Sequence, residues 1–151
     1  MNVPHTALSR RLVSDSDTPP PRVLRVLYAD DVKELRDVIQ LTLARGGHRV
    51  DCVINGAEAL RQLEAAPAGY DLLITDHHMP FMNGLELVAA VRRLPSYRGR
   101  ILVFTSELSL HIAAAYRRLQ VDQMIPKPVF PSELRRIIAS LFAEESGPNR
   151  A

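Results

Sequence analysis

Short apolar runs alternate with segments of helical periodicity along most of the chain. Val23 to Ala29 is almost continuously apolar and predicts a buried strand. The next segment repeats apolar residues at helical spacing until Gly46-Gly47, a pair typical of a helix end. The same alternation recurs downstream. The pattern predicts strands at about 23–29, 48–53, 72–75, 101–105 and 123–125, and helices at about 35–43, 57–65, 85–94, 108–119 and 131–141.

This order of elements predicts an α/β fold. Each parallel pair of strands needs a crossover connection, and each crossover helix must cover one face of the sheet. Five strand–helix units therefore predict a doubly wound, five-stranded parallel sheet with helices on both faces. In such folds ligands bind at the carboxyl ends of the strands, near the point where the strand order reverses.

The beginning of the chain differs from the rest in composition. Residues 1–22 are rich in Ser, Thr, Pro and charge, and contain the run Pro19 to Pro21, which favours an extended conformation. We predict a disordered arm over residues 1–22, one folded domain over residues 23–143 and a flexible tail over residues 144–151. Because the residues after the last helical pattern are too few for a second domain, we expect this domain to act through surface contacts.

Composition narrows the class of function. The 151 residues carry 19 Lys and Arg against 17 Asp and Glu, a balance that favours neither nucleic acid nor a membrane surface and points to a protein partner. The single cysteine, Cys52, excludes an intramolecular disulfide and a cysteine-based zinc site. The sequence has no apolar run long enough for a membrane span, and residues 1–22 contain Asp15 and Asp17 but no signal-peptide core. These features predict a cytoplasmic protein.

Polar residues stand at the ends of the predicted strands. Asp30 and Asp31 end the first strand, Asp76 the third and Thr105 the fourth, while Lys127 follows the fifth. All five belong to one edge of the sheet, where three carboxylates would repel one another unless a cation neutralises them. Hard oxygen ligands suit Mg²⁺, which shares its coordination with phosphate. The pattern thus predicts a magnesium site that accepts a phosphoryl group.

Each of these residues has a place in such chemistry. One Asp carboxylate attacks phosphorus to form an acyl phosphate, Lys127 places its charge on a phosphoryl oxygen, and the Thr105 hydroxyl donates to another. Singly, an Asp after a strand is more often a turn or helix cap. Matches at successive strand ends favour the functional interpretation, because the fold makes these positions neighbours regardless of their identity.

The motifs resemble a known family. They are Asp30-Asp31, the run Leu72 to Pro80 (LLITDHHMP) with Asn83-Gly84, the run Val103 to Ser106 (VFTS) and Pro126-Lys127-Pro128. Over residues 23–143 the chain resembles the receiver domains of bacterial two-component signalling, similar to the chemotaxis regulators. The resemblance implies a flavodoxin-like (βα)5 fold with strand order 2-1-3-4-5.

The resemblance also implies the roles of the site residues. Asp76 would be the phosphoacceptor, and Mg²⁺ would be held by Asp30, Asp31, Asp76 and the backbone carbonyl of His78, with Asp31 the more direct ligand of the first pair. Thr105 would be the switch hydroxyl. Lys127 would contact the phosphoryl group and precede a cis Lys127–Pro128 bond, a geometry that fits a tight turn.

A receiver domain implies particular partners. The phosphoryl group would come from a histidine kinase or a histidine phosphotransfer protein, and the signal would leave through the face of the fourth helix, fifth strand and fifth helix. The same face would serve a possible homodimer. Such a protein is not an enzyme in the usual sense, since it at most phosphorylates and dephosphorylates itself.

Two positions depart from the family pattern. Met124 stands where many receivers have a switch Tyr or Phe, so no aromatic ring can rotate there. His78 stands two positions after Asp76, where it would either hydrogen-bond the phosphoryl group or obstruct the hydrolytic water.

Alternative functions stay open. A pseudo-receiver would bind partners without being phosphorylated. The complete set of site residues argues against it, whereas Met124 is compatible with it. An aspartyl phosphatase would need a second Asp where His78 stands, and a flavin phosphate would face Asp30-Asp31 in place of an anion cradle.

Overall fold

The computed structural model describes residues 22–143. The predicted tail, and the predicted arm except Arg22, lie outside the described residues. The strands are β1 (Arg25–Ala29), β2 (Arg49–Val53), β3 (Leu72–Thr75), β4 (Arg100–Thr105) and β5 (Gln123–Pro126). The helices are α1 (Lys33–Arg45), α2 (Gly56–Ala65), the short 3₁₀ helix η2 (Pro67–Gly69), α3 (Gly84–Arg92), α4 (Leu110–Arg118) and α5 (Pro131–Ala143).

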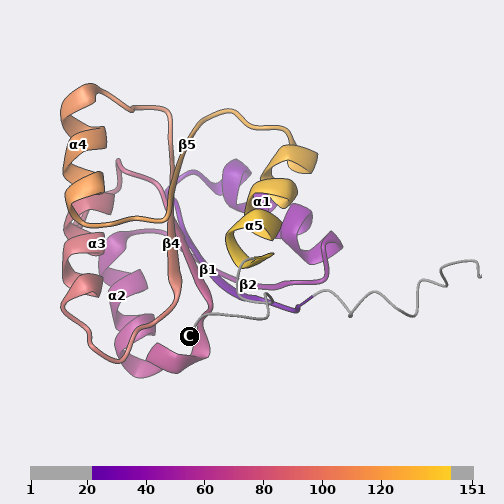
Figure 1. The fold of residues 1–151 in the computed structure, drawn as a ribbon, viewed down its shortest axis with the longest axis horizontal. Coiled ribbons are helices and arrows are strands. Elements are labelled where there is room, and N and C mark those ends of the chain that lie inside the picture. The colour runs from indigo at the N-terminus through magenta and orange to yellow at the C-terminus, as the bar shows by residue number, and fades with distance from the viewer. Residues whose placement is uncertain (1–21, 144–151) are drawn as a thin grey trace, which may run out of the picture.

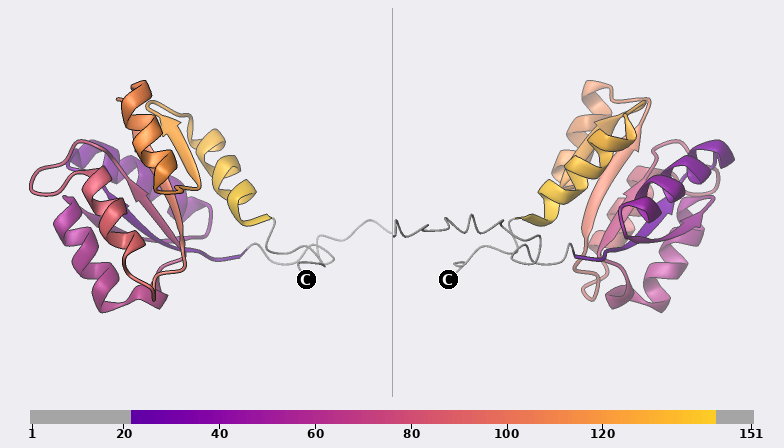
Figure 2. Two further views of the ribbon diagram at one scale, coloured as in Figure 1. Left: turned by 60° about the vertical axis from the view of Figure 1, so that its left-hand side comes forward. Right: turned by 90° about the vertical axis from the view of Figure 1, so that its right-hand side faces the viewer.

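The five strands form one parallel sheet in the order β2-β1-β3-β4-β5, the order that the family resemblance implied (Figure 1). Helices α2, α3 and α4 cover one face of the sheet, and α1 and α5 cover the other (Figure 1). The turned views of Figure 2 show the same layers from the side. The predicted fold class and strand order are therefore confirmed.

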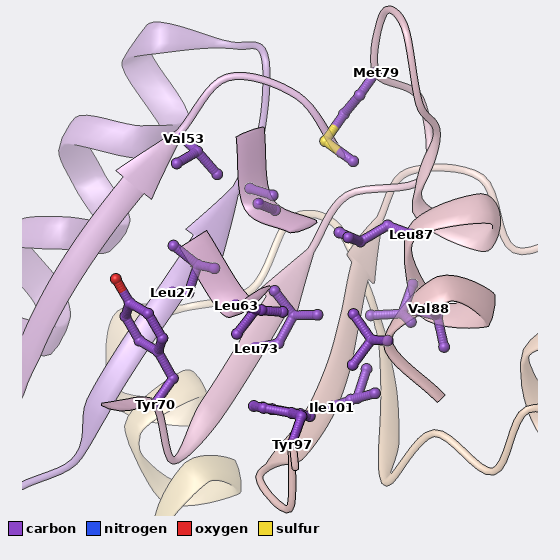
Figure 3. Close-up of a cluster of buried hydrophobic side chains, with 14 of the residues drawn as sticks. Leu27, Val53, Leu63, Tyr70, Leu73, Met79, Leu87, Val88, Tyr97 and Ile101 are labelled. Atoms are coloured by element: carbon purple, nitrogen blue, oxygen red, sulfur yellow. The ribbon is translucent and has the colours of Figure 1, made fainter. Parts of the chain in front are cut away.

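Strand residues alternate between two apolar cores. On β1, Leu27 and Ala29 face the core beneath α2, α3 and α4, whereas Val26 and Tyr28 face the core beneath α1 and α5. Figure 3 shows the first core, where strand residues such as Leu27, Leu73 and Ile101 meet side chains from the covering helices. Because both faces of the central strands are buried, these strands carry the continuous apolar runs seen in the sequence.

Helix starts follow local capping. Asn55 caps α2 by accepting a 2.8 Å hydrogen bond from the backbone N–H of Glu58, as the sequence predicted. Helix α4 begins at Leu110, later than the predicted start at Leu108, because the Ser109 side chain accepts from the backbone N–H of Ile112 and so caps the helix there. The sequence analysis did not predict η2.

Within residues 22–143, none of the helices has the length and apolar character that a membrane span requires.

Candidate functional site

The carboxyl ends of β1 and β3 bring three aspartates together. Parallel pairing sets Ala29 beside Thr75, so the residues that follow these strands are neighbours. Asp30 is completely buried and Asp76 is 7% exposed, whereas Asp31 is exposed to solvent. One carboxylate oxygen from each of the three lies within 4.8 Å of the others. The cluster predicted from strand ends is therefore present.

Asp30 is held by contacts on several sides. The Tyr28 hydroxyl donates a 2.6 Å hydrogen bond to its Oδ2, and the backbone N–H of Val32 donates to Oδ1 at 2.9 Å. The guanidinium of Arg36 donates to its backbone carbonyl at 2.8 Å. Burial, followed by the hydrogen bond to Asp30, raises the pKa of the Tyr28 phenol, so Tyr28 stays a donor.

Lys127 joins two of the aspartates. Its Nζ lies 2.7 Å from Asp30 Oδ2 and 3.2 Å from Asp76 Oδ2, and its side chain is 11% exposed. The ammonium group also lies 5.2 Å from the centre of the Phe104 ring. The Lys127–Pro128 peptide bond is cis, as the resemblance implied.

Asp76 lies in a tightly packed turn. The backbone N–H of His77 donates a 2.7 Å hydrogen bond to Asp76 Oδ1, which leaves Oδ2 toward Lys127. Gly84, the first residue of α3, packs so closely that a Cβ there would come within 2.2 Å of the Asp76 carbonyl oxygen. Only glycine fits at this position, which accounts for the Asn83-Gly84 pair in the motif.

Thr105 ends β4 on the other side of Asp76. It is completely buried and pairs in register with Pro126, the residue before Lys127. Its hydroxyl accepts a 3.2 Å hydrogen bond from the backbone N–H of Glu107, and its carbonyl accepts from the backbone N–H of Lys127 at 2.9 Å. The structure thus places all the predicted site residues at one edge of the sheet.

Two histidine contacts beside Asp76 were not predicted. The exposed imidazole of His78 pairs with the Glu107 carboxylate, and this hydrogen bond raises the pKa of His78 and lowers that of Glu107. The His77 ring is buried and lies 2.6 Å, from Nδ1 to Oη, from Tyr116 of α4. Burial, together with the nearby His78, lowers the pKa of His77.

Signals for some of these contacts exist in the sequence. Glu107 follows Thr105 by two positions, just as His78 follows Asp76 by two, so both belong to adjoining strand ends. Tyr28 lies on β1 two residues before Asp30, and residues two apart in an extended segment point to the same side. The contact of Tyr116 with His77 depends on how α4 lies over the sheet, and has no comparable signal.

The three carboxylates fit a hard divalent cation. They offer only oxygen ligands, which Mg²⁺ prefers. Three negative carboxylates lie close together, and the single positive charge of Lys127 neutralises only part of their charge. Within the described residues this is also the only cluster of three or more potential metal-ligating side chains.

Fold and site together define a flavodoxin-like α/β protein with a cluster of three aspartates and a lysine at the carboxyl edge of its sheet. Residues 26–139 match the response regulator receiver domain family. The chain belongs to this family, whose members are signalling phosphoacceptors rather than enzymes in the usual sense.

Relatives of this chain include proteins of very different size. It is 31% identical over 131 residues to the chemotaxis protein CheY homologue of Campylobacter jejuni, covering 85% of this chain and 99% of that protein. It is 35% identical over 124 residues to the sensory/regulatory protein RpfC of Xanthomonas campestris. This match covers 80% of this chain but only 17% of RpfC.

A solved structure has the same fold. The chemotaxis response regulator CheY4 of Vibrio cholerae superposes with a TM-score of 0.73 at 30% identity, covering 80% of this chain and 99% of that one.

Proposed function

We propose that this protein is a response regulator that accepts a phosphoryl group on Asp76 in an Mg²⁺-dependent reaction and signals through protein contacts. The observation that carries the proposal is the position of Asp76 Oδ2, which lies 3.2 Å from Lys127 Nζ beside the carboxylates of Asp30 and Asp31. This arrangement supplies a nucleophilic oxygen, a fixed positive charge and a set of potential metal ligands side by side.

The chemical step uses the oxygen of Asp76 that faces Lys127. Asp76 Oδ2 attacks the phosphorus of a phosphohistidine, and the bond from phosphorus to the donor nitrogen breaks. The donor imidazole, protonated on its other nitrogen, leaves as a neutral ring, and Asp76 becomes an acyl phosphate. The transfer depends mainly on positioning and charge, which the 2.7 Å hydrogen bond from His77 and the ammonium of Lys127 provide.

Asp30, Asp31, Asp76 and the backbone carbonyl of His78 would hold the metal. When bound, Mg²⁺ would offset the charge of the carboxylates and of the phosphoryl oxygens. The Thr105 hydroxyl, buried at the end of β4, would donate to a phosphoryl oxygen once Asp76 is modified.

The donor is a histidine kinase or a histidine phosphotransfer protein. Matching segments in RpfC and in the sensor histidine kinase AruS of Pseudomonas aeruginosa, 33% identical over 137 residues, support this class of partner.

A protein donor must cover the edge of the sheet to reach Asp76. At this edge of the sheet, each strand is followed by one exposed large apolar side chain, which lies in the loop before the next helix or at the first residue of that helix. We call these the apolar rim: Val32, Ile54, Phe81, Leu110 and Phe130.

The signal leaves through the face of α4, β5 and α5, which is also the surface for a possible homodimer. Met124, in place of a switch aromatic, is half-buried on β5 and packs against the core beneath α4. The pseudo-receiver alternative is not favoured, because the three aspartates and Lys127 come together and Thr105 ends the neighbouring strand β4. The single cysteine, Cys52, is free, which supports a cytoplasmic location.

The test is intact-mass spectrometry after incubation with acetyl phosphate and Mg²⁺. We expect a gain of one phosphoryl mass in the native chain, no gain in Asp76→Asn, and loss of the gain when a chelator removes Mg²⁺. Asp71→Asn, an acidic residue at the opposite end of β3, is the matched control and should be modified normally. An unmodified native chain, beside a control receiver that is modified, would overturn the proposal.

A further inference from the structure

A buried hydrogen bond connects the residue after Asp76 to helix α4. His77 Nδ1 lies 2.6 Å from the Tyr116 hydroxyl, and the two rings meet edge to face with their centres 5.6 Å apart. His77 is 8% exposed and Tyr116 is completely buried. The proposed chemistry uses the backbone of His77 but not its side chain, and it does not use Tyr116.

His77 is fixed to the phosphorylation site by its backbone. Its N–H donates to Asp76 Oδ1 at 2.7 Å, and its carbonyl accepts a 2.8 Å hydrogen bond from the backbone N–H of Gly84. A Cβ on Gly84 would lie 2.6 Å from the Tyr116 hydroxyl and 3.0 Å from the His77 Cα. No room is therefore left between the start of α3, the turn after Asp76 and the last turn of α4, so that a shift of one displaces the others.

Tyr116 can make a hydrogen bond that the residue at the usual switch position on β5 cannot. The residue on β5 that would otherwise respond to Thr105 is Met124, whose thioether accepts hydrogen bonds only weakly and donates none. Tyr116, in contrast, has a hydroxyl directed at the turn that carries Asp76.

We propose that the hydrogen bond between His77 and Tyr116 couples the phosphorylation of Asp76 to helix α4. The inference rests on the proposed function, because it needs a phosphoryl group on Asp76. Formation of the acyl phosphate at Oδ2 leaves Oδ1 as a neutral carbonyl oxygen, with the negative charge now on the phosphoryl group, and so weakens Oδ1 as an acceptor from the His77 N–H. The His77 peptide then shifts, and Tyr116 carries the shift into α4.

The experiment compares hydrogen–deuterium exchange of residues 110–118 in the full chain with and without acetyl phosphate, in the presence of Mg²⁺. Phosphorylation of each protein is first confirmed by intact mass. In the native chain we expect exchange in α4 to change by about threefold or more on phosphorylation. In Tyr116→Phe we expect Asp76 to be phosphorylated but α4 exchange to stay unchanged.

Two further variants separate coupling from stability. Tyr97→Phe removes another buried phenol of the same core, which donates to the Arg100 carbonyl at 2.8 Å at the opposite edge of the sheet. It should respond to phosphorylation like the native chain. His77→Phe keeps a ring of similar size but cannot hydrogen-bond, and should lose the response as Tyr116→Phe does, which covers the case where Tyr116→Phe does not fold.

The outcomes distinguish the two proposals. If the native chain gains no phosphoryl mass, the proposed function fails. If the native chain is phosphorylated but α4 does not respond, or if Tyr116→Phe or His77→Phe responds fully, the coupling is wrong while the proposed function stands.

Discussion

The ammonium group of Lys127 lies 2.7 Å from the completely buried carboxylate of Asp30. Breaking a buried ion pair from one side leaves an uncompensated charge. We expect Lys127→Met to lower the free energy of unfolding by about 3 kcal/mol without Mg²⁺. Added Mg²⁺ should stabilise this variant more than the native chain, because the metal would replace the missing positive charge. Urea unfolding with and without Mg²⁺ measures both effects.

The control for this prediction is Lys33→Met. Lys33 forms a 2.8 Å ion pair with Asp37, but both side chains are largely exposed, so its loss should change stability little. An equal response of Lys127→Met and the native chain to Mg²⁺ would show that Lys127 and the metal do not act on the same carboxylates.

Asp31 contributes charge to the cluster without being buried. We expect Asp31→Asn to weaken Mg²⁺ binding by about tenfold or more, because a carboxylate close to a divalent cation is worth more than 1 kcal/mol. The free energy of unfolding should barely change, since Asp31 is exposed. Isothermal titration calorimetry measures the affinity. Asp37→Asn, an exposed acid on α1, should bind Mg²⁺ like the native chain, and an unchanged Asp31→Asn would place the metal elsewhere.

The sequence was sufficient to predict which residues meet at the site. Asp30 and Asp76 follow strands whose apolar runs identify them as central, and in a parallel sheet such ends are neighbours whatever the helices do. Lys127 was predicted in the same way, because it follows the carboxyl end of another strand of the same parallel sheet. The strand limits agree within about two residues, because the continuous apolar runs end where the strands leave the core.

Contacts that depend on side-chain reach across layers were not predicted. The pairing of His77 with Tyr116 requires that α4 place one residue over the turn after β3, and the apolar pattern fixes only which face of α4 is buried. The shorter α4 likewise resulted from the single cap at Ser109, which competes with the apolar pattern that begins at Leu108.

The pair of His78 and Glu107 connects the loops that follow β3 and β4, on either side of Asp76. We propose that this pair limits the approach of water to the acyl phosphate. His78→Ala and Glu107→Ala should each shorten its half-life by a few fold, and the double variant should lose no more than either single one, because both remove the same contact. Loss of phosphoryl mass after removal of acetyl phosphate gives the half-lives. Additive effects in the double variant would show that the two side chains act separately.

Phe81 is 90% exposed and has a left-handed backbone, with φ of 67°, in the loop after Asp76. Such a conformation is unusual for an aromatic residue, and unusual backbone conformations are concentrated at functional sites, which supports a role for Phe81 in binding. We expect Phe81→Ser to reduce phosphotransfer from a histidine kinase or phosphotransfer protein by about tenfold, through a higher KM. Phosphorylation by acetyl phosphate, which is too small to contact the apolar rim, should be unchanged.

A substitution away from the rim provides the control for Phe81. Val23→Ser changes an exposed apolar residue just before β1, at the opposite end of the strands, and should leave transfer from the protein donor unaffected. If Phe81→Ser slows the reaction with acetyl phosphate as much as that with the protein donor, Phe81 acts on the site and not on docking.

His48 links stability to pH. Its Nδ1 accepts a 3.1 Å hydrogen bond from the backbone N–H of Leu24, and burial lowers its pKa in the folded state below the ordinary value of 6.5. The unfolded chain therefore binds the proton more readily, so the stabilising contribution is complete above pH 6.5 and declines as pH falls through and below that value.

Urea unfolding at pH 7.5 and 5.5 should show a smaller loss of stability in His48→Gln than in the native chain, because glutamine does not titrate while its carbonyl can still accept from Leu24. His111→Gln, on the opposite layer of the molecule in α4, should behave like the native chain. Equal losses in the native chain and His48→Gln would assign the pH dependence to other groups.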